Sequence, residues 1–160
     1  MGERFDLVVK GGTVVTPNGI AEADIGVVGG KVTAIGAFSD SAAAEVFDAG
    51  GLHVLPGVID TQVHFREPGA PQKEDLAHGT RAAVLGGVTA IFEMPNTNPL
   101  TLSAIELNDK LARAAEVAWC DHAFFMGGAA ENADQLGELE LLAGCSGVKI
   151  FMGSSTGSLL

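Results

Sequence analysis

Short apolar runs rich in β-branched residues, separated by tight turns, make up the first third of the chain. The turns are marked by Pro17-Asn18-Gly19 and by Gly29-Gly30, and the second pair has the composition of a two-residue hairpin. The runs themselves predict four strands: Phe5–Val9, Thr13–Val15, Ala23–Val28 and Lys31–Ile35. This pattern predicts a small β module over residues 1–54.

Beyond Pro56 the pattern changes to strand, helix, strand. Strands are expected at 55–65, 88–94, 120–126 and 147–152, and helices at 73–85, 103–116 and 133–143. Ser103 with Glu106, and Asn132 with Gln135, have the spacing of helix N-terminal capping residues. Repeated βα units predict a parallel sheet with right-handed crossovers, either doubly wound or an eight-stranded barrel. No Gly-x-Gly-x-x-Gly follows the first strand, which argues against dinucleotide binding.

The length of the chain limits how much of such a fold it holds. A closed (β/α)₈ barrel needs about 250 residues, whereas the whole chain has 160. We therefore expect an α/β chain that is the front part of a longer protein. Residues 55–160 would supply about the first four βα units, and the part alone is expected to have negligible activity.

Net charge and cysteine content indicate which classes of partner are unfavourable and in which cellular compartment the protein is expected. The formal charge of −11 disfavours nucleic acid and anionic membranes. No apolar run approaches a membrane span, and no secretion signal is visible. Cys120 and Cys145 have no metal-type spacing and are expected to be reduced and structural, which predicts a cytoplasmic protein.

A row of polar residues ends the first strand of the second region. Asp60, Gln62, His64 and Arg66 alternate with apolar or small residues, so a regular strand would point all four to one side. Burying four such groups is costly unless they bind something, which suggests a metal ion or an anionic substrate. There are alternatives to a binding site: the strand is half-exposed, His64 is a hydrogen-bonded core residue, or Arg66 is ion-paired.

Two further polar sites follow later strands, at the edge where α/β enzymes place their chemistry. Asn96 and Asn98 lie in a proline-flanked loop and are either turn formers or ligands. Lys149 interrupts the apolar run Gly147–Met152, where burial of an ammonium favours the neutral amine. Such an amine can add carbon dioxide to become a metal-bridging carbamate. Alternatively, Lys149 reaches the rim or pairs with Glu93.

Taken together, these motifs resemble the dihydroorotase branch of the amidohydrolase superfamily. The segments that carry the resemblance are the β module, Leu55–Asp60, Gln62–Gly69, Met94–Pro99 and Gly147–Met152. The resemblance implies a partial (β/α)₈ TIM-type barrel preceded by part of a small β-sandwich module. It also implies hydrolysis of a cyclic amide, interconverting dihydroorotate and N-carbamoyl-L-aspartate in pyrimidine biosynthesis.

The resemblance assigns roles to individual residues. His64 and a carboxylated Lys149 would bind zinc, one or two ions in the complete protein, and Arg66 and Asn96 would hold the substrate carboxylate. Gln62 departs from the family pattern because it replaces the first metal-binding histidine, and its amide is a weaker zinc ligand. The catalytic acid or base of the family lies on later strands, so none is expected in this chain.

Two other functions remain open on the sequence. A hydantoinase- or allantoinase-like enzyme opens similar rings that lack the carboxylate. A catalytically inactive dihydroorotase-like protein could instead serve as a structural partner of aspartate transcarbamoylase, which the substitution at Gln62 favours. The expected partners are a small-molecule substrate and further copies of the chain in a homo-oligomer.

Overall fold

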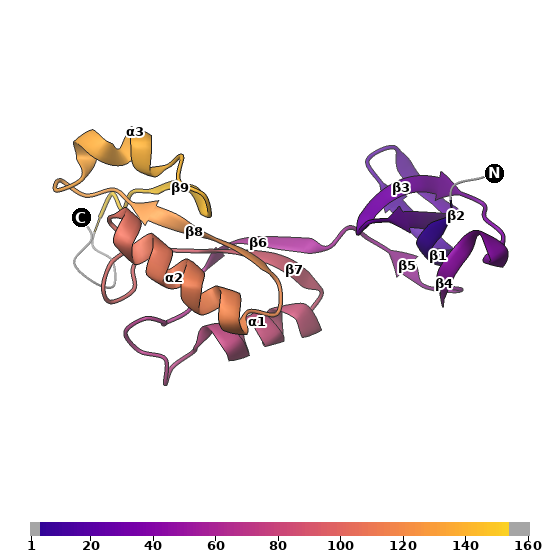
Figure 1. Cartoon of the computed structure of the whole chain (residues 1–160), viewed down its shortest axis with the longest axis horizontal. Helices are drawn as coiled ribbons and strands as arrows, with labels where there is room; N and C mark the ends of the chain where they lie inside the picture. The colour runs from indigo at the N-terminus through magenta and orange to yellow at the C-terminus, as the bar shows by residue number, and fades with distance from the viewer. Residues whose placement is uncertain (1–3, 154–160) are drawn as a thin grey trace. The chain divides into compact units, whose positions relative to one another are not determined.

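A computed structural model describes residues 4–153 of the chain. The chain divides into two compact units, Met1–Pro56 and Gly57–Leu160, which are coloured from indigo to yellow along the sequence in Figure 1. Within the described residues, no helix has the length and apolar character needed to cross a membrane.

The first unit is built on one mixed sheet. Its elements are β1 (Phe5–Thr16), β2 (Gly19–Val28), β3 (Lys31–Gly36), the 3₁₀ helix η1 (Asp40–Ala42), β4 (Ala43–Asp48) and β5 (His53–Val54). The strand order is β3-β2-β1-β4, and β5 also pairs with β1. The pairs β1–β2 and β2–β3 are antiparallel, whereas β4 and β5 run parallel to β1. The β-sandwich stays a prediction, because the described part of this unit forms a single sheet.

Glycines shape this sheet at two places. The predicted hairpin is confirmed: Gly29 and Gly30 both have positive φ, at 58° and 74°, and Val28 pairs with Lys31. The two predicted strands before Pro17 are instead one strand, β1, with a register shift between Val9 and Gly12. A side chain at Gly12 would meet Val54 Cγ2 at 2.5 Å, so the close approach of β5 requires glycine there.

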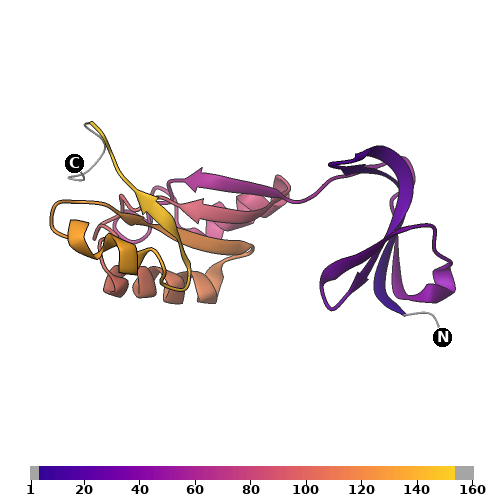
Figure 2. The same ribbon diagram turned by 90° about the horizontal axis from the view of Figure 1, so that it is seen from above.

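The second unit alternates strands and helices. Its elements are β6 (Val58–Val63), α1 (Leu76–Leu85), β7 (Val88–Glu93), α2 (Ala104–Val117), β8 (Asp121–Gly127), the 3₁₀ helix η2 (Ala133–Gln135), α3 (Leu136–Leu139) and β9 (Cys145–Lys149). The four strands form one parallel sheet in the order β6-β7-β8-β9. As Figures 1 and 2 show, α1 and α2 lie side by side along one face of this sheet. The predicted parallel sheet of alternating strands and helices is confirmed.

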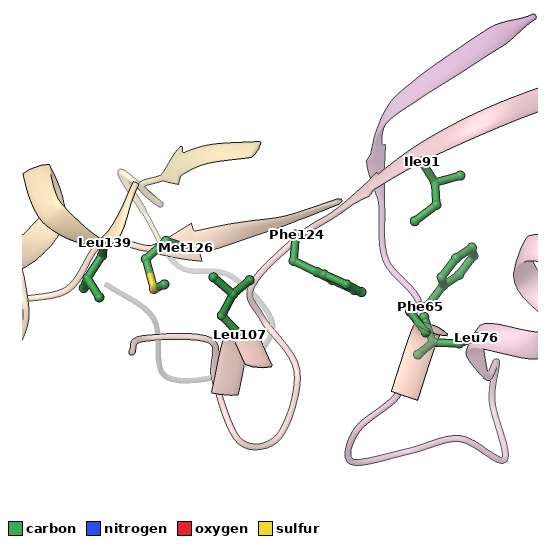
Figure 3. Packing of buried hydrophobic residues seen from close by; sticks show 8 residues of the cluster. Phe65, Leu76, Ile91, Leu107, Phe124, Met126 and Leu139 are labelled. Atoms are coloured by element: carbon green, nitrogen blue, oxygen red, sulfur yellow. The ribbon is translucent and has the colours of Figure 1, made fainter. Parts of the chain in front are cut away.

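The apolar core of the second unit lies between the sheet and these helices. Figure 3 shows side chains from the strands, from the segment after β6 and from the helices meeting in one layer. The cluster consists of Phe65, Leu76, Ile91, Leu107, Ala114, Phe124, Met126 and Leu139. Burial of this layer decides which side of each strand faces the helices.

Three predictions for the C-terminal half were wrong in detail. The helix expected at 133–143 is the short pair η2 and α3, since Gly137 weakens helix propagation. Asn132 does not cap it. Its side chain accepts from Ala129 N and donates to Leu102 O and Gly127 O, linking three loops. The last strand ends at Lys149 rather than continuing to Met152.

The predicted capping box of α2 is confirmed and gives a stability test. Ser103 Oγ accepts from Ile105 N at 3.1 Å, and Glu106 accepts from Ser103 N at 2.9 Å. Ser103→Ala should lower the free energy of unfolding by about 1 kcal/mol, because helix N–H groups lose their acceptor. Urea denaturation measures this change. An unchanged transition midpoint would show that the cap contributes nothing.

Candidate active site

Packing against the helices places Gln62 and His64 on the opposite face of the sheet. Val63 contacts the apolar cluster and Phe65 is buried in it, on the side of α1 and α2. Because successive side chains near a strand alternate, the residues on either side of Val63 point away from the helices. Gln62 is exposed there, whereas His64 is half-buried.

The sequence predicted that Asp60 belongs to the same alternating row, but the alternation does not extend to it. Asp60 pairs with Ile91 and Val63 pairs with Glu93, so the register shifts by one residue between them. The Asp60 carboxylate accepts a hydrogen bond from the backbone N–H of Gln62 at 3.0 Å. This bulge removes Asp60 from the predicted polar row and lets the chain turn at the end of β6.

Lys149 lies on the same face as His64. Phe124 and Met126 are buried on the helix side, so Phe125 and Gly127 face the other way, and Gly127 is the register partner of Lys149. Lys149 is half-buried at the end of β9 and not in the middle of a strand, which reduces its desolvation. Its Nζ lies 5.1 Å from the centre of the Phe151 ring.

A hydrogen bond fixes the orientation of the His64 ring. His64 Nδ1 lies 2.8 Å from Asn96 Oδ1, the amide oxygen of the residue that follows β7 by three positions. An amide oxygen only accepts, so this contact requires the proton on Nδ1, and of the two neutral tautomers it selects the one with the lone pair on Nε2. This is the tautomer in which Nε2 can bind a metal ion.

Arg66 and Asn96 share a cavity of about 440 Å³ between the segments that follow β6 and β7. The residues that line it are Arg66, Pro68, Gly69, Ala70, Lys73, Asn96, Thr97 and Asn98. They supply two cations, amide groups and a hydroxyl, and none of them is acidic. The cavity therefore has the chemistry of an anion-binding site.

A buried ion pair supports the turn that carries Asn96. Glu93 and Lys110 are almost fully buried, and Lys110 Nζ lies 3.1 Å from Glu93 Oε2. That distance makes the contact an ion pair. Within the described residues, neither Glu93 oxygen has a hydrogen-bond partner. Lys110 also donates to Met94 O and lies over the Phe124 ring. The alternative in which Lys149 pairs with Glu93 is therefore wrong.

Burial dominates the electrostatics of this pair. It raises the pKa of Glu93 from 4.5 to about 7, against the opposing attraction of Lys110. Burial also lowers the pKa of Lys110. Both groups are thus shifted towards their neutral forms.

The predicted metal ligands can be compared with the described part of the structure. Among them, no three His, Cys, Asp or Glu side chains come together as a set that could hold a metal ion. His64 fits a ligand position by its tautomer, and Gln62 and Lys149 share its face. The roles predicted for these three residues stay predictions.

The sequence did not predict the positions of three polar residues: Lys73 among those lining the cavity, Lys110 in the buried pair with Glu93, and Asn132 in hydrogen bonds between loops. Lys110 carried a usable signal, because it lies on the buried stripe of α2 with Leu107 and Ala114. Lys73 and Asn132 lie in or beside loops, where the pattern gives no such signal.

Residues 51–143 match the family described as Dihydro-orotase-like. The chain belongs to this family. Within the dihydro-orotase-like proteins it is similar to an allantoinase of Rubrobacter xylanophilus, 45% identical over 157 residues, or 96% of this chain and 34% of the relative. It is also similar to a dihydroorotase of Pelotomaculum thermopropionicum, 50% identical over 96 residues, or 59% of this chain and 22% of the relative.

Among solved structures, the dihydro-orotase-like chain resembles the L-hydantoinase (dihydropyrimidinase) of Arthrobacter aurescens. The TM-score is 0.89 at 35% identity, and the match covers 97% of this chain and 35% of the hydantoinase. The chain thus spans about a third of the length of such relatives. The likeness identifies the sheet and helices as part of a cyclic amidohydrolase fold.

The Glu93–Lys110 pair predicts a pH-dependent mutational effect. Lys110→Met should lower the free energy of unfolding by about 3 kcal/mol at pH 8, because loss of the ammonium raises the pKa of Glu93 further and the folded core must then hold in neutral form a carboxyl that is ionised in the unfolded chain. The loss should be smaller at pH 5, where Glu93 is protonated. In the wild type, a Glu93 pKa raised from 4.5 to about 7 means that its contribution is present below pH 4.5 and lost as the pH rises through 7.

Urea unfolding of the wild type, Lys110→Met and the double variant Glu93→Gln/Lys110→Met at both pH values measures these effects. The double variant is the matched control, since it has no carboxyl to ionise and should lose the pH dependence. Equal destabilisation by Lys110→Met at pH 5 and pH 8 would contradict the assignment.

Proposed function

We propose that this chain forms part of the active site of a metal-dependent cyclic amidohydrolase that interconverts dihydroorotate and N-carbamoyl-L-aspartate. The single observation that carries the proposal is the cavity shared by Arg66 and Asn96, because Asn96 also contacts His64. A carboxylate held in this cavity would bring the attached ring next to the candidate metal ligand.

His64 and Lys149 would hold zinc, with Gln62 as a weak ligand or hydrogen-bond partner. Neutral Lys149 can add carbon dioxide at Nζ, forming a C–N bond and releasing a proton, which yields a carbamate anion. When bound, zinc supplies Lewis-acid polarisation of the amide carbonyl and acidifies water. The number of ions, one or two, is part of the proposal for the complete protein.

Arg66 and Asn96 would position the substrate. The guanidinium forms paired, charge-assisted hydrogen bonds to a carboxylate, and the amide adds a further donor. Holding the ring by this substituent fixes the scissile C–N bond without itself moving a proton. Hydrolysis adds hydroxide to the ring carbonyl carbon and a proton to the nitrogen; none of the residues described here is assigned the proton transfer.

The second candidate is a hydantoinase- or allantoinase-like enzyme. It is favoured by the similar proteins, which carry the names allantoinase and L-hydantoinase. Allantoin and hydantoin lack the exocyclic carboxylate of dihydroorotate. The two candidates therefore differ in what they require from Arg66.

A third possibility is a catalytically inactive, dihydroorotase-like structural partner of aspartate transcarbamoylase. Gln62 favours it, because an amide oxygen is a poor substitute for an imidazole as a zinc ligand. The contact of His64 Nδ1 with Asn96 Oδ1 argues against it, since that contact leaves Nε2 available to a metal ion.

Arg66→Ala separates the two enzyme candidates. In the full-length protein that carries this sequence, the variant should lose about 10- to 100-fold in kcat/KM for dihydroorotate, because a charge-assisted hydrogen bond to the carboxylate is lost. Activity on hydantoin or allantoin should change little. Steady-state kinetics on all three substrates gives the result, and Arg66→Lys should retain part of the activity. Faster wild-type turnover of a neutral ring than of dihydroorotate would select the alternative.

Zinc content tests the metal assignment. Purified without chelators, the full-length protein should contain at least one zinc per chain, and His64→Ala should lower that content. Gln62→His should bind zinc more tightly than the wild type, since imidazole is the stronger ligand. Mass spectrometry for metals and for an added carboxylate on Lys149 measures both features. Near-zero zinc in the wild type would favour the inactive partner.

A further inference from the structure

The segment that follows β6 folds back on itself and brings a second cation to the cavity. Ala70 N donates to Arg66 O at 2.6 Å, Lys73 N donates to Ala70 O at 2.9 Å, and Arg66 N donates to Glu74 O at 2.9 Å. These three hydrogen bonds close residues 66–74 into a loop. As a result, Arg66 and Lys73 both line the cavity although seven positions separate them.

This loop is fastened to the segment after β7. Asn98 N donates to Pro68 O at 3.1 Å. Gly69 has a φ of +117°, and a Cβ placed there would lie 2.8 Å from Asn98 Cβ and 3.0 Å from the Asn98 backbone. Only glycine permits this close approach. The two walls of the cavity are therefore held together before any ligand arrives, which reduces the entropic cost of binding.

The charge of the cavity contrasts with that of the protein. The chain has a net charge of −11, yet the residues lining the cavity include Arg66 and Lys73 and no carboxylate. The neighbouring Glu67 carboxylate is used elsewhere: it accepts from Leu76 N at 3.0 Å and lies 3.6 Å from Arg113. The described residues that line the cavity thus include two cationic side chains and no acidic one, which favours an anionic ligand.

We propose that Lys73 is a specificity-determining residue of this cavity, whose ammonium group joins Arg66 in binding the carboxylate of a ring substrate. The inference rests on the proposed function and adds a residue to it. Lys73 is exposed, so it contributes attraction and selectivity for anionic rings rather than chemistry. A neutral ring gains nothing from it.

Binding of orotate and of uracil to the full-length protein tests this role, because the two rings differ by the carboxylate. Lys73→Gln should raise the Kd of orotate about two- to fivefold, the range of a solvent-exposed ion pair, and leave the Kd of uracil unchanged. Lys73→Arg should retain orotate binding. Lys31→Gln is the matched control, since it removes an exposed lysine that does not line the cavity. Isothermal titration calorimetry at low and high salt provides the values.

Arg66→Ala in the same experiment separates failure of this inference from failure of the proposed function. Unchanged orotate binding in Lys73→Gln, with weakened binding in Arg66→Ala, would overturn the role of Lys73 alone. Unchanged orotate binding in both variants would overturn the carboxylate cavity and the proposed function together. An equal loss of uracil and orotate affinity in Lys73→Gln would also overturn the inference, since the lysine would then contact the ring.

Discussion

Packing of the parallel sheet against α1 and α2 is the constraint on which the candidate site depends. Each apolar side chain that enters the helix-side layer forces its neighbour along the strand to the opposite face. Phe65 in that layer places His64 on the other side, and Phe124 and Met126 do the same for the register partner of Lys149. The candidate ligands therefore share a face because of what the helices bury, and a change in that layer acts on the site indirectly.

The same layer holds a charged pair that connects α2 to the site. Lys110 donates to Met94 O, and two residues further on Asn96 contacts the His64 ring. A pair buried this deeply is weak evidence for added stability, because desolvation offsets the attraction between its members. Its position is consistent with a geometric role: Lys110 donates to the backbone at the start of the turn, and Asn96 in that turn contacts the His64 ring.

The sequence allowed the elements to be predicted better than the contacts between them. Period-two and period-3.6 patterns predicted the four strands of the second unit with α1 and α2, whereas β4 and β5 of the first unit were not predicted. The spacing of Ser103 and Glu106 predicted a cap that the structure confirms. The bulge after Asp60 was not predictable, because a one-residue register shift depends on the neighbouring strand. Pairing of Lys149 with Glu93, one of the alternatives for Lys149, is absent from the described part of the chain for a similar reason: the partner of Glu93 is Lys110 on a helix, and only its place on the buried stripe of α2 distinguishes it from a surface lysine.

The fold and the cavity give different kinds of information about the substrate. A TM-score of 0.89 to an L-hydantoinase describes the sheet and its helices, and one scaffold of this type supports many substrates by varying its loops. The proposed substrate specificity rests instead on the segments after β6 and β7, whose residues lining the cavity include two cationic side chains and two amides. In that proposal, a carboxylate on the ring is attracted to these two cationic side chains, whereas a neutral ring is not. The charge of these two loops therefore supports the proposed substrate class independently of the likeness of the scaffold that carries them.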